Sequence, residues 1–193
     1  MPRGQVNVDY HQYEVAGGCP DGDFVDELPG LARRSGGGWV VVITGAQYGE
    51  ITVEGESVMD PPSAVEEGWD VVGEVDVLVE DGEALLVSDW AGPANPEIGN
   101  LAITGPGLYR LRIHARGRLE GVSDPAAEHH RLICWPVKSE TRSRFLTQLD
   151  AYGEMFVSPP TLKGPIGVRL GQAGEVFDLN DSPPSPEREG GPQ

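Results

Sequence analysis

The chain has 193 residues, of which 38% are hydrophobic and 23% are charged, so it is long enough for one domain with a buried core. Its formal net charge is −17, because 31 Asp and Glu outnumber 14 Lys and Arg, and a negative surface repels nucleic-acid phosphates. No apolar run approaches the length of a membrane span, and residues 1–10 contain no apolar signal segment. The sequence therefore predicts a cytoplasmic protein without membrane or direct nucleic-acid binding.

The hydrophobic pattern predicts a chain of short β-strands. Residues 5–15 alternate apolar and polar side chains with one change of phase at His11-Gln12, which is typical of a β-bulge. Residues 39–44 form a β-branched run bounded by glycines, which indicates a central strand. A hairpin is expected at Asp81-Gly82. Further strands are expected at 47–54, 69–80, 83–90, 98–104, 108–118 and 131–137.

The pattern changes toward the C-terminus. Large apolar residues recur there at spacings of three or four within 139–156, which predicts an amphipathic helix. Those residues are Phe145, Leu149, Tyr152 and Phe156. Residues 166–170 and 175–179 predict a last short hairpin, and residues 180–193 contain almost no apolar side chains, which predicts a disordered tail.

These elements together predict a mainly β fold. Many short strands separated by turn signals are typical of an antiparallel β-sandwich, here of about seven to nine strands, with one C-terminal amphipathic helix. We expect this single domain to cover residues 1–179, followed by the tail over 180–193.

The acidic residues are unevenly distributed. Residues 1–100 contain 20 acidic and 3 basic residues, whereas residues 101–193 contain 11 of each, and no basic residue lies between Arg34 and Arg110. Carboxylates in such a block imitate the phosphates that the basic groove of a nuclease binds, or they serve only solubility. The residues expected to contact a basic protein partner are Glu66, Glu67, Asp70, Glu74 and Asp76.

A cationic row stands out in residues 108–118, which read LYRLRIHARGR. Successive side chains of a strand point to opposite faces, so Tyr109, Leu111, Ile113 and Ala115 belong to the core face. The other face carries Arg110, Arg112, His114 and Arg116. This row is either a site for an anionic small ligand or carbohydrate, or an ion-paired face whose partners across the sheet are Glu74, Asp76, Glu80 or Glu83.

No pattern in the sequence predicts an enzyme, a cofactor or a metal site. His11 has no accompanying nucleophile motif such as G-x-S-x-G, and a hydrogen-bonded structural role is the better interpretation of this residue. The adjacent His129 and His130 lack the spacing of paired metal ligands and are interpreted as part of a loop cluster. Cys19 and Cys134 form no C-x-x-C pair and are expected to be reduced and structural.

Two stretches resemble one protein family. VNVDYHQYEV near the N-terminus and GPGLYRLRIHARG later in the chain are similar to two strands of competence protein J, an inhibitor of the DNA-entry nuclease of competent bacteria. Tyr10, His11 and Gln12 match that family's signature residue by residue. The resemblance implies a small cytosolic β protein that binds and blocks a nuclease.

We therefore expect a non-enzymatic, acidic binding protein of the cytoplasm that acts on a basic protein partner, as a nuclease inhibitor or an immunity-type module. The alternative is a small-ligand or carbohydrate-binding β-sandwich that uses the Arg-lined strand 108–118.

Overall fold

The computed structural model describes residues 1–18, 23–157, 168–170 and 176–178. The chain divides into two compact units, residues 1–158 and residues 159–193, and each is described by itself. The tail expected over 180–193 lies outside the described residues.

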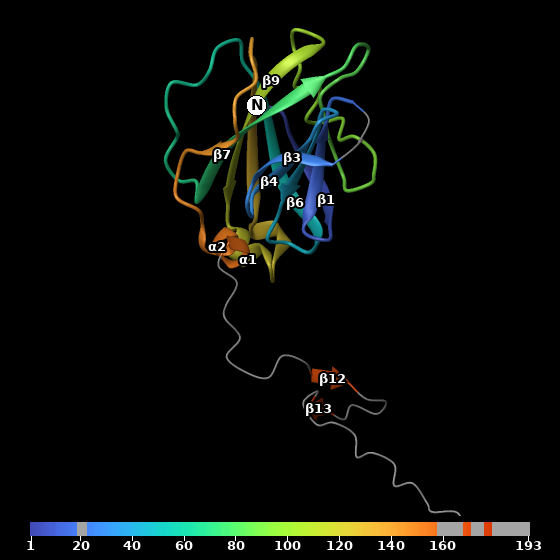
Figure 1. The fold of residues 1–193 in the computed structure, drawn as a ribbon, viewed down its shortest axis with the longest axis vertical. Coiled ribbons are helices and arrows are strands. Elements are labelled where there is room, and N and C mark those ends of the chain that lie inside the picture. The colour runs from blue at the N-terminus through green and yellow to red at the C-terminus, as the bar shows by residue number, and fades with distance from the viewer. Residues whose placement is uncertain (19–22, 158–167, 171–175, 179–193) are drawn as a thin grey trace, which may run out of the picture. The chain divides into compact units, whose positions relative to one another are not determined.

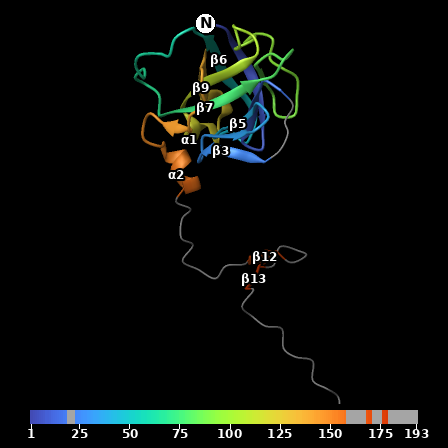
Figure 2. The same ribbon diagram turned by 45° about the horizontal axis from the view of Figure 1, so that its top comes forward.

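The first unit is mainly β, as predicted, and eleven of its strands belong to one sheet that curls into a nearly closed barrel (Figures 1 and 2). The strands are β1 (Arg3–Asp9), β2 (Gln12–Ala16), β3 (Phe24–Leu28), β4 (Ala32–Ser35), β5 (Trp39–Ile43), β6 (Tyr48–Ser57), β7 (Val71–Val79), β8 (Leu86–Ser88), β9 (Gly107–Arg116), β10 (His129–Pro136) and β11 (Arg144–Phe145).

The sheet has the order β11-β7-β9-β10-β6-β1-β2-β5-β4-β3, and β8 pairs with β2 beside this path. Its neighbouring strands are antiparallel except for β6 and β10, which run parallel. A sandwich of seven to nine strands is not confirmed, because the strands form one continuous sheet rather than two separate layers.

The core lies inside this curled sheet and contains the face of β9 that the sequence predicted. Tyr109, Leu111, Ile113 and Ala115 are buried in it together with Ile51 and Val53 of β6 and alternate valines of β7. The strict period of two in β9 places these four side chains on one face, so their burial follows directly from the sequence.

The change of phase at residues 10–12 is a turn and not a β-bulge. Tyr10 and His11 have φ angles of 51° and 64°, and Asp9 pairs with Gln12. Positive φ at both central residues is what a tight two-residue hairpin of the type I′ class requires. The expected single strand over 5–15 is therefore the β1–β2 hairpin.

The prediction of a β-hairpin at Asp81-Gly82 is also wrong. The chain does turn there, with Gly82 at a φ of 84°, but the returning strand β8 pairs with β2 instead of β7. Residues 98–104 are turn and loop rather than a strand.

The helix expected over 139–156 is present only as α2 (Ala151–Val157). Part of the expected range is β11, which pairs with β7, and the Leu146 N–H continues this pairing by donating to the Val72 carbonyl at 2.8 Å. Phe145 and Leu149 still pack against the core, because a short extended segment followed by a helical turn brings them to the same surface.

Two further short helices precede β10. They are α1 (Arg118–Gly121) and the 3-10 helix η1 (Pro125–Ala127). Among the described helices, none has the length and apolar character that a membrane crossing needs. In the second unit, β12 (Val168–Leu170) and β13 (Val176–Asp178) form an antiparallel pair, which confirms the predicted last hairpin.

Candidate partner-binding site

The five acidic residues expected to contact a partner fall into two groups. Glu66, Glu67 and Asp70 are exposed on the loop before β7. Glu74 and Asp76 lie on β7 and are only 1% exposed, so the prediction that they face a partner is wrong. β7 lies between β9 and β11, and the Thr141 N–H donates to Asp76 Oδ2, which places the loop around Thr141 over this carboxylate.

The cationic row explains why these two carboxylates are buried. Asp76 is opposite Arg110 and Glu74 is opposite Arg112 in the β7–β9 register. Arg110 donates from Nη1 to Asp76 Oδ1 at 2.7 Å, and Arg112 donates from Nε to Glu74 Oε1 at 2.9 Å. The ion-paired interpretation of Arg110 and Arg112 is therefore confirmed.

The same guanidinium groups also hold two loops against the sheet. Arg112 donates from Nη1 to the Ala64 carbonyl at 3.0 Å and from Nη2 to the Pro62 carbonyl at 3.3 Å. Arg110 donates from Nη2 to the Arg142 carbonyl at 3.2 Å. Each nitrogen of Arg112 thus has an internal acceptor, so few N–H groups of this side chain remain to bind an anionic ligand.

The other two residues of the row differ in exposure. Arg116 is exposed, and its guanidinium carbon lies 5.0 Å from the centre of the Trp69 ring. His114 is buried, and its Nδ1–H donates a hydrogen bond to the Arg131 carbonyl at 3.2 Å. Burial, together with the nearby cations, lowers the pKa of His114 to about 4, so this residue is neutral at pH 7.

A cleft at one end of the first unit brings acidic residues together. It has a volume of about 360 Å³, and its lining residues come from the loop before β7, from α1 and from the region of α2. They are Asp70, Leu119, Glu120, Asp150, Ala151 and Tyr152. The cleft therefore joins three carboxylates to two aliphatic side chains and one aromatic side chain.

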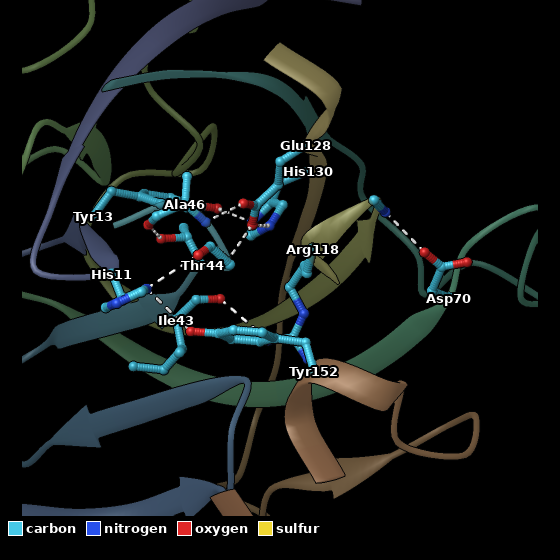
Figure 3. A network of polar contacts seen from close by, with 12 residues as sticks. His11, Tyr13, Ile43, Thr44, Ala46, Asp70, Arg118, Glu128, His130 and Tyr152 are labelled. Carbon is cyan, nitrogen blue, oxygen red and sulfur yellow. Dashed lines mark hydrogen bonds and ion pairs between the residues drawn. The ribbon is translucent and has the colours of Figure 1, made fainter. Parts of the chain in front are cut away.

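Local contacts set the first wall of this cleft. Asp70 accepts a hydrogen bond at Oδ2 from the Gly117 N–H at 2.8 Å (Figure 3), and Gly117 has a φ of 71°. Leu119 and Glu120 follow on α1 with exposed side chains. Among the described residues, Glu120 makes no ion pair.

Arg118 fixes the second wall, and Figure 3 shows it beside Tyr152 of α2. Its side chain is fully buried, pairs with both oxygens of Asp150 and also donates to the Gly30 and Ile43 carbonyls. Its guanidinium lies over the Tyr152 ring at 5.1 Å. Because these contacts are made inside the chain, the cleft is preformed.

A second buried polar network lies behind the cleft (Figure 3). Tyr13 Oη lies 3.2 Å from His130 Nδ1, and His130 Nε2 lies 2.8 Å from Glu128 Oε1. Glu128 also accepts the Gly45 and Ala46 N–H groups at 3.0 and 2.8 Å.

No member of this network is accessible to a substrate. Tyr13, Glu128 and His130 are each 0% exposed, and burial raises the pKa of Tyr13 well above its usual value. The network secures the turn after β5 to β10. The interpretation of His129 and His130 as part of a loop cluster is wrong, because both lie on β10. The alternation of His130, Leu132 and Cys134 on one face of that strand was a usable signal.

The three residues that matched competence protein J lie at the β1–β2 hairpin. Tyr10 is exposed, whereas the His11 Nδ1 atom lies 3.1 Å from both the Gly45 carbonyl and the Tyr152 hydroxyl. Gln12 begins β2. His11 therefore connects the hairpin to a residue that lines the cleft.

The described part of the chain contains no metal-binding cluster and no reactive thiol. No group of three or more His, Cys, Asp or Glu residues there has the geometry to hold a metal ion. Cys134 is a free, buried thiol, and burial raises its pKa to about 12, which makes it unreactive. Cys19 lies outside the described residues.

Comparisons with known proteins give no match to a family model, a curated protein or a solved structure. The resemblance to competence protein J stays a prediction.

Proposed function

We propose that this chain is a non-enzymatic, cytoplasmic binding protein that recognises a basic protein partner through the acidic cleft between the loop before β7, α1 and α2. The partner class that the resemblance to competence protein J favours is a nuclease, whose basic substrate groove would receive the carboxylates.

The composition of the cleft carries this proposal. Asp70 and Glu120 present carboxylates beside Leu119, which is 52% exposed. A carboxylate pair next to an exposed aliphatic side chain suits a lysine or arginine, because the charged head meets the carboxylates and the methylene stem packs on the apolar surface.

The overall charge supports the same conclusion. Glu67 is exposed on the same loop as Asp70, and Glu66 is partly neutralised by Arg131 at 2.5 Å. With a net charge of −17, the whole molecule attracts a basic protein over distances longer than a contact, which raises the association rate at low salt.

The test compares two variants that change charge equally. Asp70→Asn together with Glu120→Gln removes two charges from the cleft. Asp81→Asn together with Glu83→Gln removes two charges from the turn at the opposite end of β7. The immobilised wild type and both variants are exposed to extracts of the source cell at low salt, and bound proteins are released with a salt gradient.

We expect the wild type and the Asp81/Glu83 variant to retain the same basic protein, and the Asp70/Glu120 variant to lose it. Equal loss from both variants would show that net charge alone retains the partner. Retention of the same protein by all three would show that the cleft is not the binding site.

A further inference from the structure

A surface patch beside the β1–β2 hairpin has features that the cleft does not explain. We call it the turn patch, and it consists of Asp9, Tyr10, Tyr48 and Glu50. Tyr10 is 65% exposed and Tyr48 is 53% exposed. Their ring centres lie 5.9 Å apart with an interplanar angle of 64°. Two large aromatic side chains thus lie together in solvent.

The backbone at this patch is strained. Tyr10 and His11 both adopt positive φ, which bulky residues disfavour and which Asn-Gly adopts readily in this turn. His11 gains contacts in return, because its ring approaches Gly45 and Tyr152 and its carbonyl accepts the Thr44 N–H at 2.9 Å. In the described chain, the aromatic contact of Tyr10 is with Tyr48, so packing inside the molecule gives little reason for a tyrosine here.

The charges of the patch are not neutralised within the described residues. Asp9 is opposite Tyr48 in the β1–β6 register, and Glu50 is exposed nearby on β6. Neither carboxylate makes an ion pair there. Asp9 Oδ1 is buried and has no hydrogen-bond donor. Strain stored at an exposed turn commonly marks a functional site.

We propose that the turn patch binds a guanidinium or ammonium group of the basic partner, which rests on the proposed function. The two tyrosine rings attract a cation through their π faces, and the carboxylates supply the counter-charge. A contact links the patch to the acidic cleft, because His11 follows Tyr10 directly and hydrogen-bonds to Tyr152, which lines the cleft. Tyr10 would then be an aromatic anchor of an interface whose other half is Asp70 and Glu120.

The experiment uses a capped tri-arginine peptide as the probe and a capped tri-citrulline peptide, which is similar in shape but neutral, as its control. The full chain carries isotope labels in its tyrosine rings and backbone amides. NMR titrations then follow the ring signals of Tyr10 and Tyr48 separately from the amide signals of Leu119 and Glu120. The variants Tyr10→Phe and Tyr10→Leu keep or remove the aromatic ring.

We expect tri-arginine, but not tri-citrulline, to shift both tyrosine rings. In Tyr10→Leu the dissociation constant measured at Tyr48 should rise about threefold, whereas Tyr10→Phe should leave it unchanged. Equal shifts with tri-citrulline would overturn cation recognition. Shifts at Leu119 and Glu120 without shifts at the tyrosines would overturn the turn patch while leaving the proposed function standing. No shift at the tyrosine rings or at the amides of Leu119 and Glu120 would overturn both the turn patch and the proposed function.

Discussion

Arg110 and Asp76 form an ion pair across β9 and β7, with Nη1 and Oδ1 2.7 Å apart and side chains that are 6% and 1% exposed. Burial raises the pKa of Asp76 even though Arg110 and the Thr141 N–H lower it. The pair therefore mainly offsets the cost of burying two charges, and its net contribution to stability is small. Its role is to hold the loop around Thr141 against the sheet.

Removing one member of this ion pair should strongly destabilise the fold. Arg110→Met leaves the Asp76 carboxylate buried without its partner, and we expect the free energy of unfolding to fall by about 3–5 kcal/mol. Adding Asp76→Leu to the same chain should recover most of that loss, because the uncompensated charge is removed. Urea denaturation of the three proteins measures both effects.

The exposed pair of Arg33 and Glu27, 4.0 Å apart, is the matched control. Arg33→Met should cost less than about 1 kcal/mol, since exposed ion pairs contribute little. If Arg33→Met and Arg110→Met were equally destabilising, burial of the Arg110 pair would not be the cause.

His114 should make stability depend on pH. Burial lowers its pKa from 6.5 to about 4, so between these values the unfolded chain binds the proton and the folded chain does not. The free energy of unfolding therefore falls as pH decreases through this window, by about 2 kcal/mol at pH 5 relative to pH 8 from this residue alone.

The variant His114→Gln isolates this contribution. Glutamine retains a donor for the Arg131 carbonyl and does not titrate, so the difference in stability between pH 8 and pH 5 should shrink by that amount. An identical pH profile for the wild type and His114→Gln, measured by urea denaturation at each pH, would contradict the assignment.

Arg118 should control both the stability of the chain and the order of α2. Arg118→Met leaves Asp150 and the Gly30 and Ile43 carbonyls without their donor, which we expect to cost about 3–5 kcal/mol. Amide hydrogen exchange should accelerate in α2, which includes Tyr152, more than in β9. Uniform acceleration throughout the sheet would show that Arg118 does not specifically hold the cleft.

Tyr10→Asn should stabilise the fold, unlike most substitutions. Asparagine adopts positive φ more readily than tyrosine, and Tyr10 is 65% exposed, so we expect a gain of about 0.5–1 kcal/mol. Thermal unfolding measures the change, with Tyr48→Asn as the comparison, since Tyr48 is similarly exposed but does not lie in the turn. A loss of stability in Tyr10→Asn would show that Tyr10 is held in place for structural reasons.

The parts of the fold that follow a local pattern were predictable. The core face of β9 follows from its period of two, and the ion pairs of Arg110 and Arg112 follow from acidic residues of the same period on residues 74–76. The β1–β2 turn was missed because Tyr-His is an unusual pair for positive φ. The pairing of β8 with β2 was missed because tertiary packing, rather than the Asp81-Gly82 turn, selects the partner strand.

The candidate site was predictable only in part. Asp70 was one of the five acidic residues expected to contact a partner, but Glu120 and Asp150 were not among them and reach the cleft only through the folded chain. Nothing in local sequence indicates that Arg118 joins α1 to α2, since it follows the cationic row as one more arginine. The helical spacing of Phe145 and Leu149 concealed β11, because the same residues reach the core from a short strand and a turn.

The most direct test is the salt dependence of association between the wild type and the basic partner that it retains, measured by stopped-flow mixing from about 50 to 500 mM salt. We predict that the association rate falls at least about tenfold over this range. The Asp70→Asn, Glu120→Gln variant should show a lower rate and a flatter dependence than the Asp81→Asn, Glu83→Gln control. An association rate that does not change with salt, or equal dependences in the two variants, would contradict recognition of a basic partner by the acidic cleft.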